Sequence, residues 1–300
     1  MKKIAVIGSG TMGNGIAHVF AQYGYQVSMV DVNEQALNKG LENISNYLGR
    51  QVLKGTLSET EKQAALDKIQ VFTRCSEAVQ DVDLVIEAAT ENEATKLQIF
   101  RELDQYCPAS TLFASNTSSL SITKLASVTT RADKIIGMHF MNPVPMMKLV
   151  EVVRGYRTSS ETVLSIVDLS KKLEKEPVVV NDYPGFVANR ILMPMINEAI
   201  STLYEGVAGI EEIDAIMKLG MAHPMGPLQL ADFIGLDVCL AILKVLHQGF
   251  GNPKYAHCPL LTNMVEAGAL GKKSGEGFYL YKKDSKEHWV SPRFNINRQS

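Results

Sequence analysis

One pattern near the start of the chain restricts the fold more than any other feature of the sequence. Residues 3–7 form a short apolar run rich in β-branched side chains without alternation, which predicts a buried parallel strand. The run leads directly into Gly8-Ser-Gly-Thr-Met-Gly, and residues 16–23 then have the apolar spacing of a helix. This succession predicts a dinucleotide-binding βαβ unit, although a chance glycine-rich turn would contain the same letters.

Each glycine of the pattern has a specific use in such a unit. Gly8 permits the tight turn, Gly10 lets the backbone approach a pyrophosphate, and Gly13 lets helix and strand pack closely. The helix that follows begins with N–H groups that can bind phosphate oxygens. We therefore predict that the whole loop binds the cofactor, through Gly8, Ser9, Gly10, Thr11, Met12 and Gly13.

A second predicted strand, residues 26–31, ends in Asp31. A carboxylate at this distance from the glycine pattern accepts hydrogen bonds from the adenosine ribose and repels a 2′-phosphate, so Asp31 favours NAD over NADP. Another interpretation is that Asp31 caps the following helix, a role that Asn33 would also suit.

The next segments continue a Rossmann-type, doubly wound α/β sheet. Further strands are predicted at residues 69–73, 82–89 and 111–115. Two helices precede the first of them, one over residues 34–53 and one that begins at Ser58, whereas a plain crossover needs one. We therefore predict a helical insertion at about residues 34–69.

Three charged groups in this half of the chain are candidates for ligand contacts. Glu91 and Lys96 follow the strand at residues 82–89, at the carboxyl edge where ligands bind in open α/β sheets. They would suit the start of an ordinary helix equally well. Lys54, in the insertion, is a candidate contact for an anionic substrate, although such charges more often form a solvated helix face.

A second candidate site centres on His139, where an apolar run stops. Two prolines follow and turn the chain before another apolar segment, residues 148–153. Extended segments joined in this way can lie side by side, which would bring Glu151 towards His139. A carboxylate fixes the ring proton of an imidazole and stabilises the imidazolium, as a general base requires. The competing interpretation is a structural histidine, with the Ser/Thr/Asn cluster at residues 116–119 forming only a turn.

The alternation of strands and helices ends after residues 177–180, so we place the domain boundary near Asp182 and expect domains at residues 1–182 and 183–300. The second domain is predicted to be all-α. Its first helix is expected to have Pro184 in its first turn and to end near Tyr204.

Two features of this second domain point to contacts outside it. Asn189 is a polar residue on an apolar helix stripe, so it must bind protein, water or ligand. The run at residues 238–246 is apolar on more than one face, which predicts a homodimer formed through the C-terminal helices, although a monomer core has the same pattern.

Composition argues against several other classes of function. A net charge of −2 gives no general attraction to nucleic acid, so an anionic ligand must be held by local groups. The sequence has no apolar stretch long enough for a signal peptide or a membrane span. Its four cysteines have neither CxxC nor secreted-framework spacing, which favours reduced thiols. We therefore expect a soluble cytoplasmic protein.

With these segments identified, the chain from Lys3 to about Tyr281 resembles the short-chain L-3-hydroxyacyl-CoA dehydrogenases, and most closely their bacterial members. The resemblance rests on six motifs in this order, GSGTMGNGIA, FASNTSSL, GMHFMNPVPMMKLVEVV, DYPGFVANRIL, HPMGP and GKKSGEGFY. It implies an NAD-linked, reversible oxidation of an (S)-3-hydroxyacyl-CoA to the 3-ketoacyl-CoA.

The resemblance also implies roles for individual residues. The base is His139, Glu151 orients it, and Ser118 and Asn189 hold the substrate. The expected NAD contacts outside the glycine loop are Asp31, Glu91, Lys96, Ser118, Asn142 and Lys273. The helical insertion resembles the arm over which the family binds coenzyme A, with Lys54 as the candidate contact.

Two other functions fit the same fold. The chain could be a related dehydrogenase of a free 3-hydroxy acid, or a nucleotide-binding protein without turnover. The presence of His139, Glu151 and Asn189 argues against the second of these, because a protein that only binds a nucleotide has no use for a base.

Overall fold

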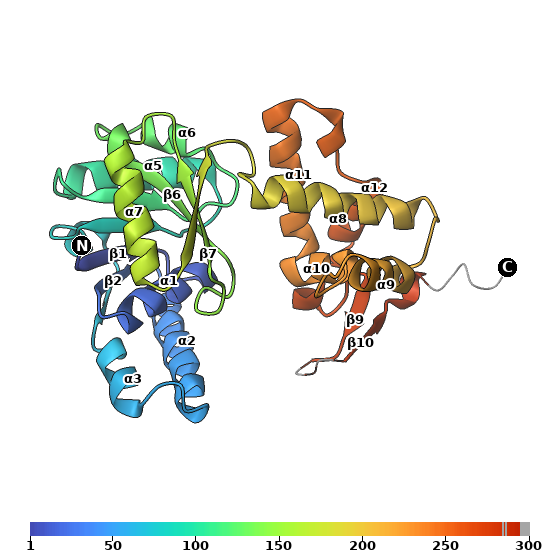
Figure 1. The fold of residues 1–300 in the computed structure, drawn as a ribbon, viewed down its shortest axis with the longest axis horizontal. Helices are drawn as coiled ribbons and strands as arrows, with labels where there is room; N and C mark the ends of the chain where they lie inside the picture. The colour runs from blue at the N-terminus through green and yellow to red at the C-terminus, as the bar shows by residue number, and fades with distance from the viewer. Residues whose placement is uncertain (284, 286, 295–300) are drawn as a thin grey trace. The chain divides into compact units, whose positions relative to one another are not determined.

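The computed structural model describes residues 1–283, 285 and 287–294 (Figure 1). The chain divides into two compact units, Met1–Phe186 and Val187–Ser300. The boundary expected near Asp182 lies a few residues before this division, so Phe186 belongs to the first unit.

The first unit is built on an eight-stranded sheet in the order β3-β2-β1-β4-β5-β6-β7-β8. The strands are β1 (Lys3–Ile7), β2 (Gln26–Val30), β3 (Ile69–Phe72), β4 (Leu84–Glu87), β5 (Leu112–Ser115), β6 (Ile135–Phe140), β7 (Leu149–Arg154) and β8 (Glu176–Asn181). All neighbouring strands are parallel except β6 and β7, which are antiparallel. A parallel sheet with β1 between β2 and β4 confirms the predicted Rossmann-type fold.

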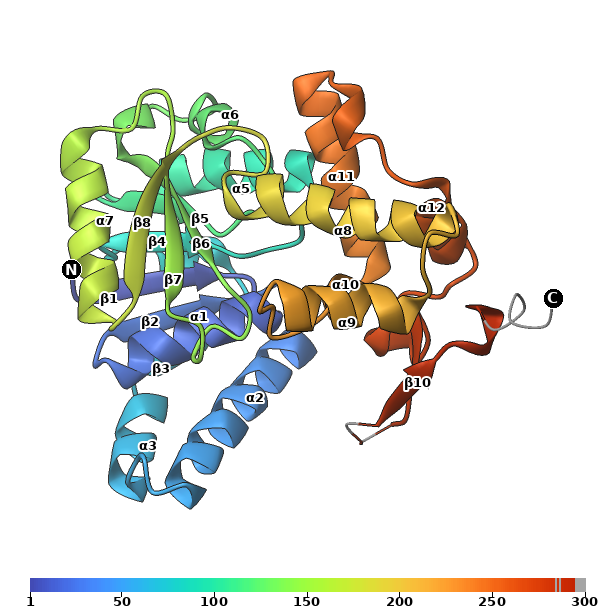
Figure 2. The same cartoon turned by 45° about the vertical axis from the view of Figure 1, so that its right-hand side comes forward.

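Helices cover both faces of this sheet (Figures 1 and 2). One core includes side chains of α1 (Thr11–Gln22), α2 (Glu34–Leu53) and α7 (Ser160–Lys172). The other includes side chains of α4 (Cys75–Ala78), α5 (Glu93–Tyr106) and α6 (Ile122–Ala126). Along β1, Ile4 and Val6 belong to the first core and Ala5 and Ile7 to the second. This strand is therefore buried on both faces, as its uninterrupted apolar run predicted.

The predicted insertion is a pair of neighbouring helices, α2 and α3 (Glu59–Leu66), which extend beyond the sheet in Figures 1 and 2. The first is capped by Asn33, whose side chain accepts a hydrogen bond from the Ala36 N–H. The second begins with a capping box between Ser58 and Glu61. Both starts follow directly from local sequence.

The second unit is mainly helical. Its helices are α8 (Ala188–Tyr204), α9 (Ile210–Gly220), α10 (Pro227–Ile234), α11 (Leu236–Phe250) and α12 (Pro259–Glu266). It also contains a small antiparallel pair, β9 (Tyr279–Tyr281) and β10 (His288–Val290), which the all-α prediction did not include. The buried carboxylate of Asp232 accepts hydrogen bonds from the N–H groups of Phe278 and Tyr279, at 3.0 and 2.9 Å. This long-range contact attaches the start of β9 to α10.

The start of α8 differs from the prediction. Gly185 and Phe186 have φ values of 72° and 51°, which a right-handed helix does not allow. The helix therefore begins at Ala188 rather than at Pro184. It ends at Tyr204, where the sequence pattern placed its end.

The apolar run on α11 is used mostly inside its own unit. The buried residues of the helix are Leu236, Cys239, Leu240, Ile242, Leu243 and Leu246. Val238, in contrast, is 40% exposed. Within the part of the chain that the structure describes, no helix has both the length and the apolar character needed to cross a membrane.

His18 lies on the buried face of α1 and is only 1% exposed. Neither of its ring nitrogens has a hydrogen-bond partner among the described residues. Burial lowers the pKa of His18 from 6.5 to about 4; the neighbouring Gln22 side chain opposes this shift and the nearby Lys175 adds to it. Between these two pH values the unfolded chain therefore binds more protons than the folded one. The free energy of unfolding should rise by about 3 kcal/mol from pH 4 to pH 6.5 and gain nothing further from this group above that range.

We expect His18→Leu to remove this pH dependence, because leucine has a similar size and no titrating group. Urea unfolding at pH 4.5, 5.5 and 7 would measure this dependence. Between pH 7 and pH 4.5 the free energy of unfolding of the native chain should fall by roughly 2–3 kcal/mol because of His18, and the variant should not show this fall. His247→Gln, at an exposed histidine of α11, is the control and should behave as the native chain does. If the free energy of unfolding changed with pH in the same way in all three proteins, His18 would not be the source of the pH dependence.

Candidate active site

The glycine loop joins β1 to α1 at the carboxyl edge of the parallel strands. Gly8 has a φ of 101°, and a Cβ there would lie 2.6 Å from the Ala88 carbonyl oxygen. A Cβ at Gly13 would lie 1.8 Å from the Gly8 carbonyl oxygen. A Cβ at Gly10 would meet nothing within 4 Å. The loop itself therefore requires glycine at positions 8 and 13, whereas Gly10 leaves open surface for a ligand.

Asp31 follows β2 and holds the glycine loop. Its Oδ2 accepts hydrogen bonds from the backbone N–H and the Oγ of Ser9, both at 2.9 Å, and its Oδ1 accepts one from the Asn33 N–H at 3.1 Å. Because Asn33 caps α2, the alternative that Asp31 caps this helix is wrong. A carboxylate has about four acceptor positions, so Asp31 can still accept a bond from a ribose hydroxyl.

One residue that supports the loop was not predicted from the sequence. Asn14, on the first turn of α1, is buried and donates hydrogen bonds from Nδ2 to the carbonyls of Gly10 and Ser9, at 2.7 and 3.3 Å. A buried amide directly after the glycine pattern was the available signal. With open surface at Gly10, a helix N-terminus beside it and a carboxylate at Asp31, this end of the sheet fits a dinucleotide.

The antiparallel pairing of β6 and β7 places His139 directly opposite Glu151. The Glu151 Oε2 lies 2.7 Å from the His139 Nδ1, and both side chains are buried. The other ring nitrogen, Nε2, lies 3.1 Å from the Ser118 Oγ. A carboxylate beside Nδ1 favours the tautomer that donates from Nδ1, which directs the Nε2 lone pair at the hydroxyl. The structure thus brings together three residues that the sequence singled out.

Two further residues hold the imidazole in place. The Asn116 Oδ1 accepts a hydrogen bond from the Phe140 N–H at 2.9 Å, which joins the end of β6 to the loop after β5. The Phe186 ring packs against the His139 ring with a centroid distance of 5.8 Å. Phe186 lies beyond the expected domain boundary, so no sequence pattern associated it with this site.

The loop that carries Ser118 is fixed by Glu91. One carboxylate oxygen of Glu91 accepts hydrogen bonds from the Thr117 Oγ1, the Ser118 N–H and the Ser119 Oγ, at 2.5, 3.0 and 3.0 Å. Burial opposes ionisation of this carboxyl, but Lys96 and these donors outweigh it and lower the pKa of Glu91 below its ordinary value. Glu91 is therefore an anion at neutral pH.

A buried ion pair lies behind Glu91. The Lys96 Nζ is 2.7 Å from the Glu87 Oε1 and 3.3 Å from the Glu91 Oε2, and it donates to the Ala89 carbonyl at 3.3 Å. Glu87 also accepts from the Ser115 Oγ at 2.6 Å. Lys96 and Glu87 are 1% and 0% exposed. Glu87 was not predicted as a site residue, although a carboxylate that ends the apolar strand Leu84–Glu87 was the signal for it.

The remaining candidates of the first unit do not contact the His139 cluster. Asn142 is exposed directly after β6, and Lys54 is exposed at the C-terminal end of α2, on the helical pair. Their ligand contacts stay predictions.

Two candidates belong to the second unit. Asn189 is buried at the start of α8, on the face that it shares with the buried Met193 and Ile196. The Lys273 Nζ lies 2.5 Å from the Asp237 Oδ1, so an ion pair holds it at α11. Contacts of Asn189 and Lys273 with substrate or cofactor also stay predictions.

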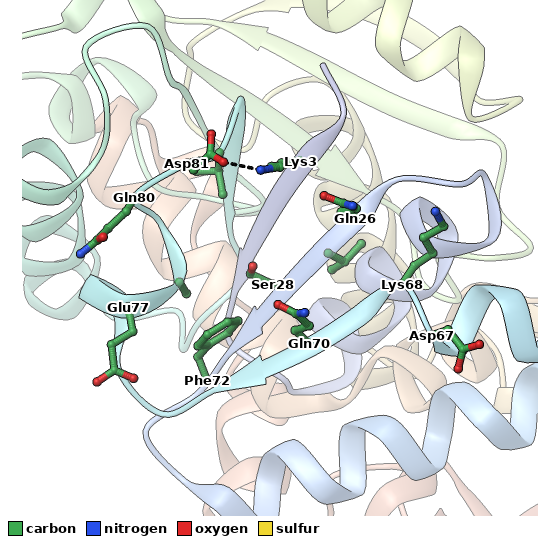
Figure 3. Close-up of a pocket in the computed structure, with 13 residues that line it drawn as sticks. Lys3, Gln26, Ser28, Asp67, Lys68, Gln70, Phe72, Glu77, Gln80 and Asp81 are labelled. Atoms are coloured by element: carbon green, nitrogen blue, oxygen red, sulfur yellow. Dashed lines mark hydrogen bonds and ion pairs between the residues drawn. The ribbon is translucent and has the colours of Figure 1, made fainter.

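A pocket of about 420 Å³ lies elsewhere on the first unit (Figure 3). It is lined by side chains such as Lys3, Gln26 and Gln70 from β1, β2 and β3. Its lining runs from Lys3 and Gln26, the first residues of β1 and β2, to Phe72, the last residue of β3. It includes no residue of the glycine loop and none of Ser118, His139 and Glu151, so this pocket is separate from the candidate site.

Comparisons with known proteins agree with this geometry. The family model "3-hydroxyacyl-CoA dehydrogenase, NAD binding domain" matches residues 3–183, and "3-hydroxyacyl-CoA dehydrogenase, C-terminal domain" matches residues 185–281. The chain belongs to the 3-hydroxyacyl-CoA dehydrogenase family. The glycine loop and the His139 cluster both lie in the NAD-binding part of this dehydrogenase.

Individual relatives of this dehydrogenase are similar over nearly their whole length. A Bacillus subtilis protein named "Probable 3-hydroxybutyryl-CoA dehydrogenase" is 56% identical over 281 residues, which is 94% of this chain and 98% of that protein. The 3-hydroxybutyryl-CoA dehydrogenase of Bradyrhizobium diazoefficiens is 51% identical over 282 residues, or 94% and 96% of the two chains. The crystal structure of (S)-3-hydroxybutyryl-CoA dehydrogenase from Ralstonia eutropha has a TM-score of 0.91 and 50% identity, covering 94% of this chain and all of that one.

Proposed function

We propose that this chain is a 3-hydroxybutyryl-CoA dehydrogenase that interconverts (S)-3-hydroxybutyryl-CoA and acetoacetyl-CoA with NAD. The observation that carries the proposal is the buried His139, held between the Glu151 carboxylate and the Ser118 hydroxyl at the edge of an NAD-binding sheet. The names of relatives at 51–56% identity support the choice of substrate.

In the oxidation direction, His139 removes the proton of the substrate hydroxyl through Nε2. Glu151 keeps the other ring nitrogen as the donor and stabilises the imidazolium that forms. Ser118, 3.1 Å from Nε2, holds the substrate oxygen next to the base, and Asn189 is a second donor to it. NAD, when bound, supplies the hydride acceptor. In the reverse direction the imidazolium protonates the carbonyl oxygen.

The proposed cofactor contacts divide into two groups. The glycine loop and Asp31 would bind the pyrophosphate and the adenosine ribose, and Asp31 disfavours NADP. Glu91, Asn142 and Lys273 are proposed to contact the rest of the cofactor. The three protons of the Lys96 ammonium already have the partners Glu87, Glu91 and the Ala89 carbonyl, so we propose that Lys96 acts by holding Glu91 in place.

Binding of coenzyme A along α2 and α3 and dimer formation belong to the same proposal. Lys54 on the helical pair would contact an anionic part of coenzyme A. The second unit exposes large apolar side chains, Ile191, Val207, Ile216, Leu219 and Met221, which supports a homodimer. The four cysteines are free thiols, which supports a reducing compartment such as the cytoplasm.

The test follows NADH absorbance with acetoacetyl-CoA and, separately, with free acetoacetate. We expect oxidation of NADH with the thioester only, and little oxidation of NADPH. Turnover of free acetoacetate at a comparable kcat/KM would favour the related dehydrogenase of a free hydroxy acid. If the protein bound NADH but turned over neither compound, the alternative of a nucleotide-binding protein without turnover would be favoured. Light scattering of the same sample would test the dimer.

A further inference from the structure

Lys175 is a buried charged residue to which the proposed mechanism assigns no role. It lies between α7 and β8 and is 7% exposed. Because β7 runs antiparallel to β6 and β8 runs parallel to β7, the start of β8 is at the same edge of the sheet as the end of β6. Lys175 is therefore at the carboxyl edge of the sheet.

The ammonium group of Lys175 is directed at the loop between β6 and β7. It donates hydrogen bonds to the carbonyls of Val144 and Met147, at 2.6 and 2.8 Å. This loop, residues 141–148, joins the strand of His139 to the strand of Glu151 and carries Asn142. Pro143 and Pro145 have no N–H groups, and the turn's own hydrogen bonds run from the N–H groups of Met146 and Met147 to the Pro143 carbonyl, both at 3.0 Å. Lys175 adds bonds to two further carbonyls of the same turn.

The same loop also packs against α1. A Cβ on Gly15 would lie 3.0 Å from the Val144 Cβ and 3.1 Å from one of its methyl groups. That separation is shorter than an ordinary van der Waals contact. Val144 itself is 2% exposed, whereas Met146 is 73% exposed. The loop is thus held at Val144 by helix packing and by one lysine, and its outer part faces solvent.

We propose that Lys175 is a positioning residue that sets the conformation of the 141–148 loop and, through it, the place of Asn142 in the cofactor site. This inference rests on the proposed function of Asn142 as an NAD contact. The strand pairing of His139 with Glu151 does not depend on Lys175, so its loss acts on cofactor binding more than on the proton-transfer step. Charge-assisted bonds to two carbonyls of one turn are strong enough to select one loop conformation.

The first experiment compares Lys175→Met with Lys175→Arg. Methionine keeps the length of the side chain and loses both hydrogen bonds, so we expect NADH affinity, measured by NADH fluorescence, to fall about tenfold, with a smaller change in kcat. Arginine can donate to both carbonyls and should restore most of the affinity. Lys134→Met is the matched control, because Lys134 donates to the Ala109 carbonyl at 2.6 Å, outside the site. It should bind NADH as the native chain does.

A second variant tests the loop without touching the lysine. Gly15→Ala should push Val144 by a few tenths of an ångström, and the higher helix propensity of alanine offsets part of this strain, so we expect the variant to bind NADH several-fold more weakly. Hydrogen exchange of residues 146–149 should become faster in Lys175→Met and unchanged in Lys134→Met.

The outcomes distinguish this inference from the proposed function. Native NADH affinity and loop exchange in both Lys175→Met and Gly15→Ala would overturn the positioning role. A fall in kcat alone, with native NADH affinity, would also overturn it. If the native chain did not turn over the thioester, the proposed function would be wrong. NADH affinity by fluorescence and hydrogen exchange of the loop could still be compared between the variants, so the positioning role would still be tested.

Discussion

Replacing His139 with glutamine should lower the kcat for acetoacetyl-CoA reduction by about two to four orders of magnitude. Glutamine can keep a hydrogen bond to Glu151 or to Ser118, but it cannot take up or release a proton at neutral pH. The glycine loop and Asp31 are untouched, so NADH should bind with nearly native affinity. Stopped-flow or steady-state absorbance gives the rate, and NADH fluorescence gives the affinity.

The matched control for this variant is His247→Gln, at an exposed histidine outside the site, which should keep native turnover. A His139→Gln protein with unchanged kcat would remove His139 from its role as the base. A variant that loses NADH binding as well as turnover would instead point to a structural histidine, the interpretation that the sequence left open.

The second large effect concerns stability. Lys96→Met should lower the free energy of unfolding by about 3–5 kcal/mol, because Glu87 is fully buried and would lose the ammonium group that lies 2.7 Å from its carboxylate. The double variant Lys96→Met with Glu87→Gln should recover part of the loss, since it also removes the carboxyl group left without that partner. Urea unfolding at pH 7 would measure both.

Lys124→Met is the control for this prediction. Lys124 also lies 2.7 Å from a carboxylate, that of Glu93, but the two side chains are 55% and 46% exposed. Losing an ion pair at the surface should cost less than about 1 kcal/mol. If Lys96→Met and Lys124→Met had the same free energy of unfolding, the prediction that burial makes the ion pair of Lys96 with Glu87 important for stability would be wrong.

Short-range patterns were sufficient for most of the first unit. The uninterrupted apolar strands, the glycine loop and the caps at Asn33 and Ser58 each depend on residues close in sequence, and the structure shows them where they were expected. The helix start expected at Pro184 was wrong because local composition does not reveal the positive φ values of Gly185 and Phe186. The β9 and β10 pair was missed for a related reason, since its attachment to Asp232 spans more than 40 residues.

The sequence by itself determined the dinucleotide-binding fold and the pairing of His139 with Glu151, because a buried strand, a glycine turn and a proline-bounded hairpin are all encoded by neighbouring residues. Only the tertiary structure showed that the buried pair of Glu87 and Lys96 supports Glu91, which fixes Ser118, and that Lys175 holds the loop after His139. These contacts join elements far apart in the chain. Removing these charges from water costs free energy, and close pairing and hydrogen bonds compensate for it, which depends on how the whole sheet edge is packed and not on any local pattern.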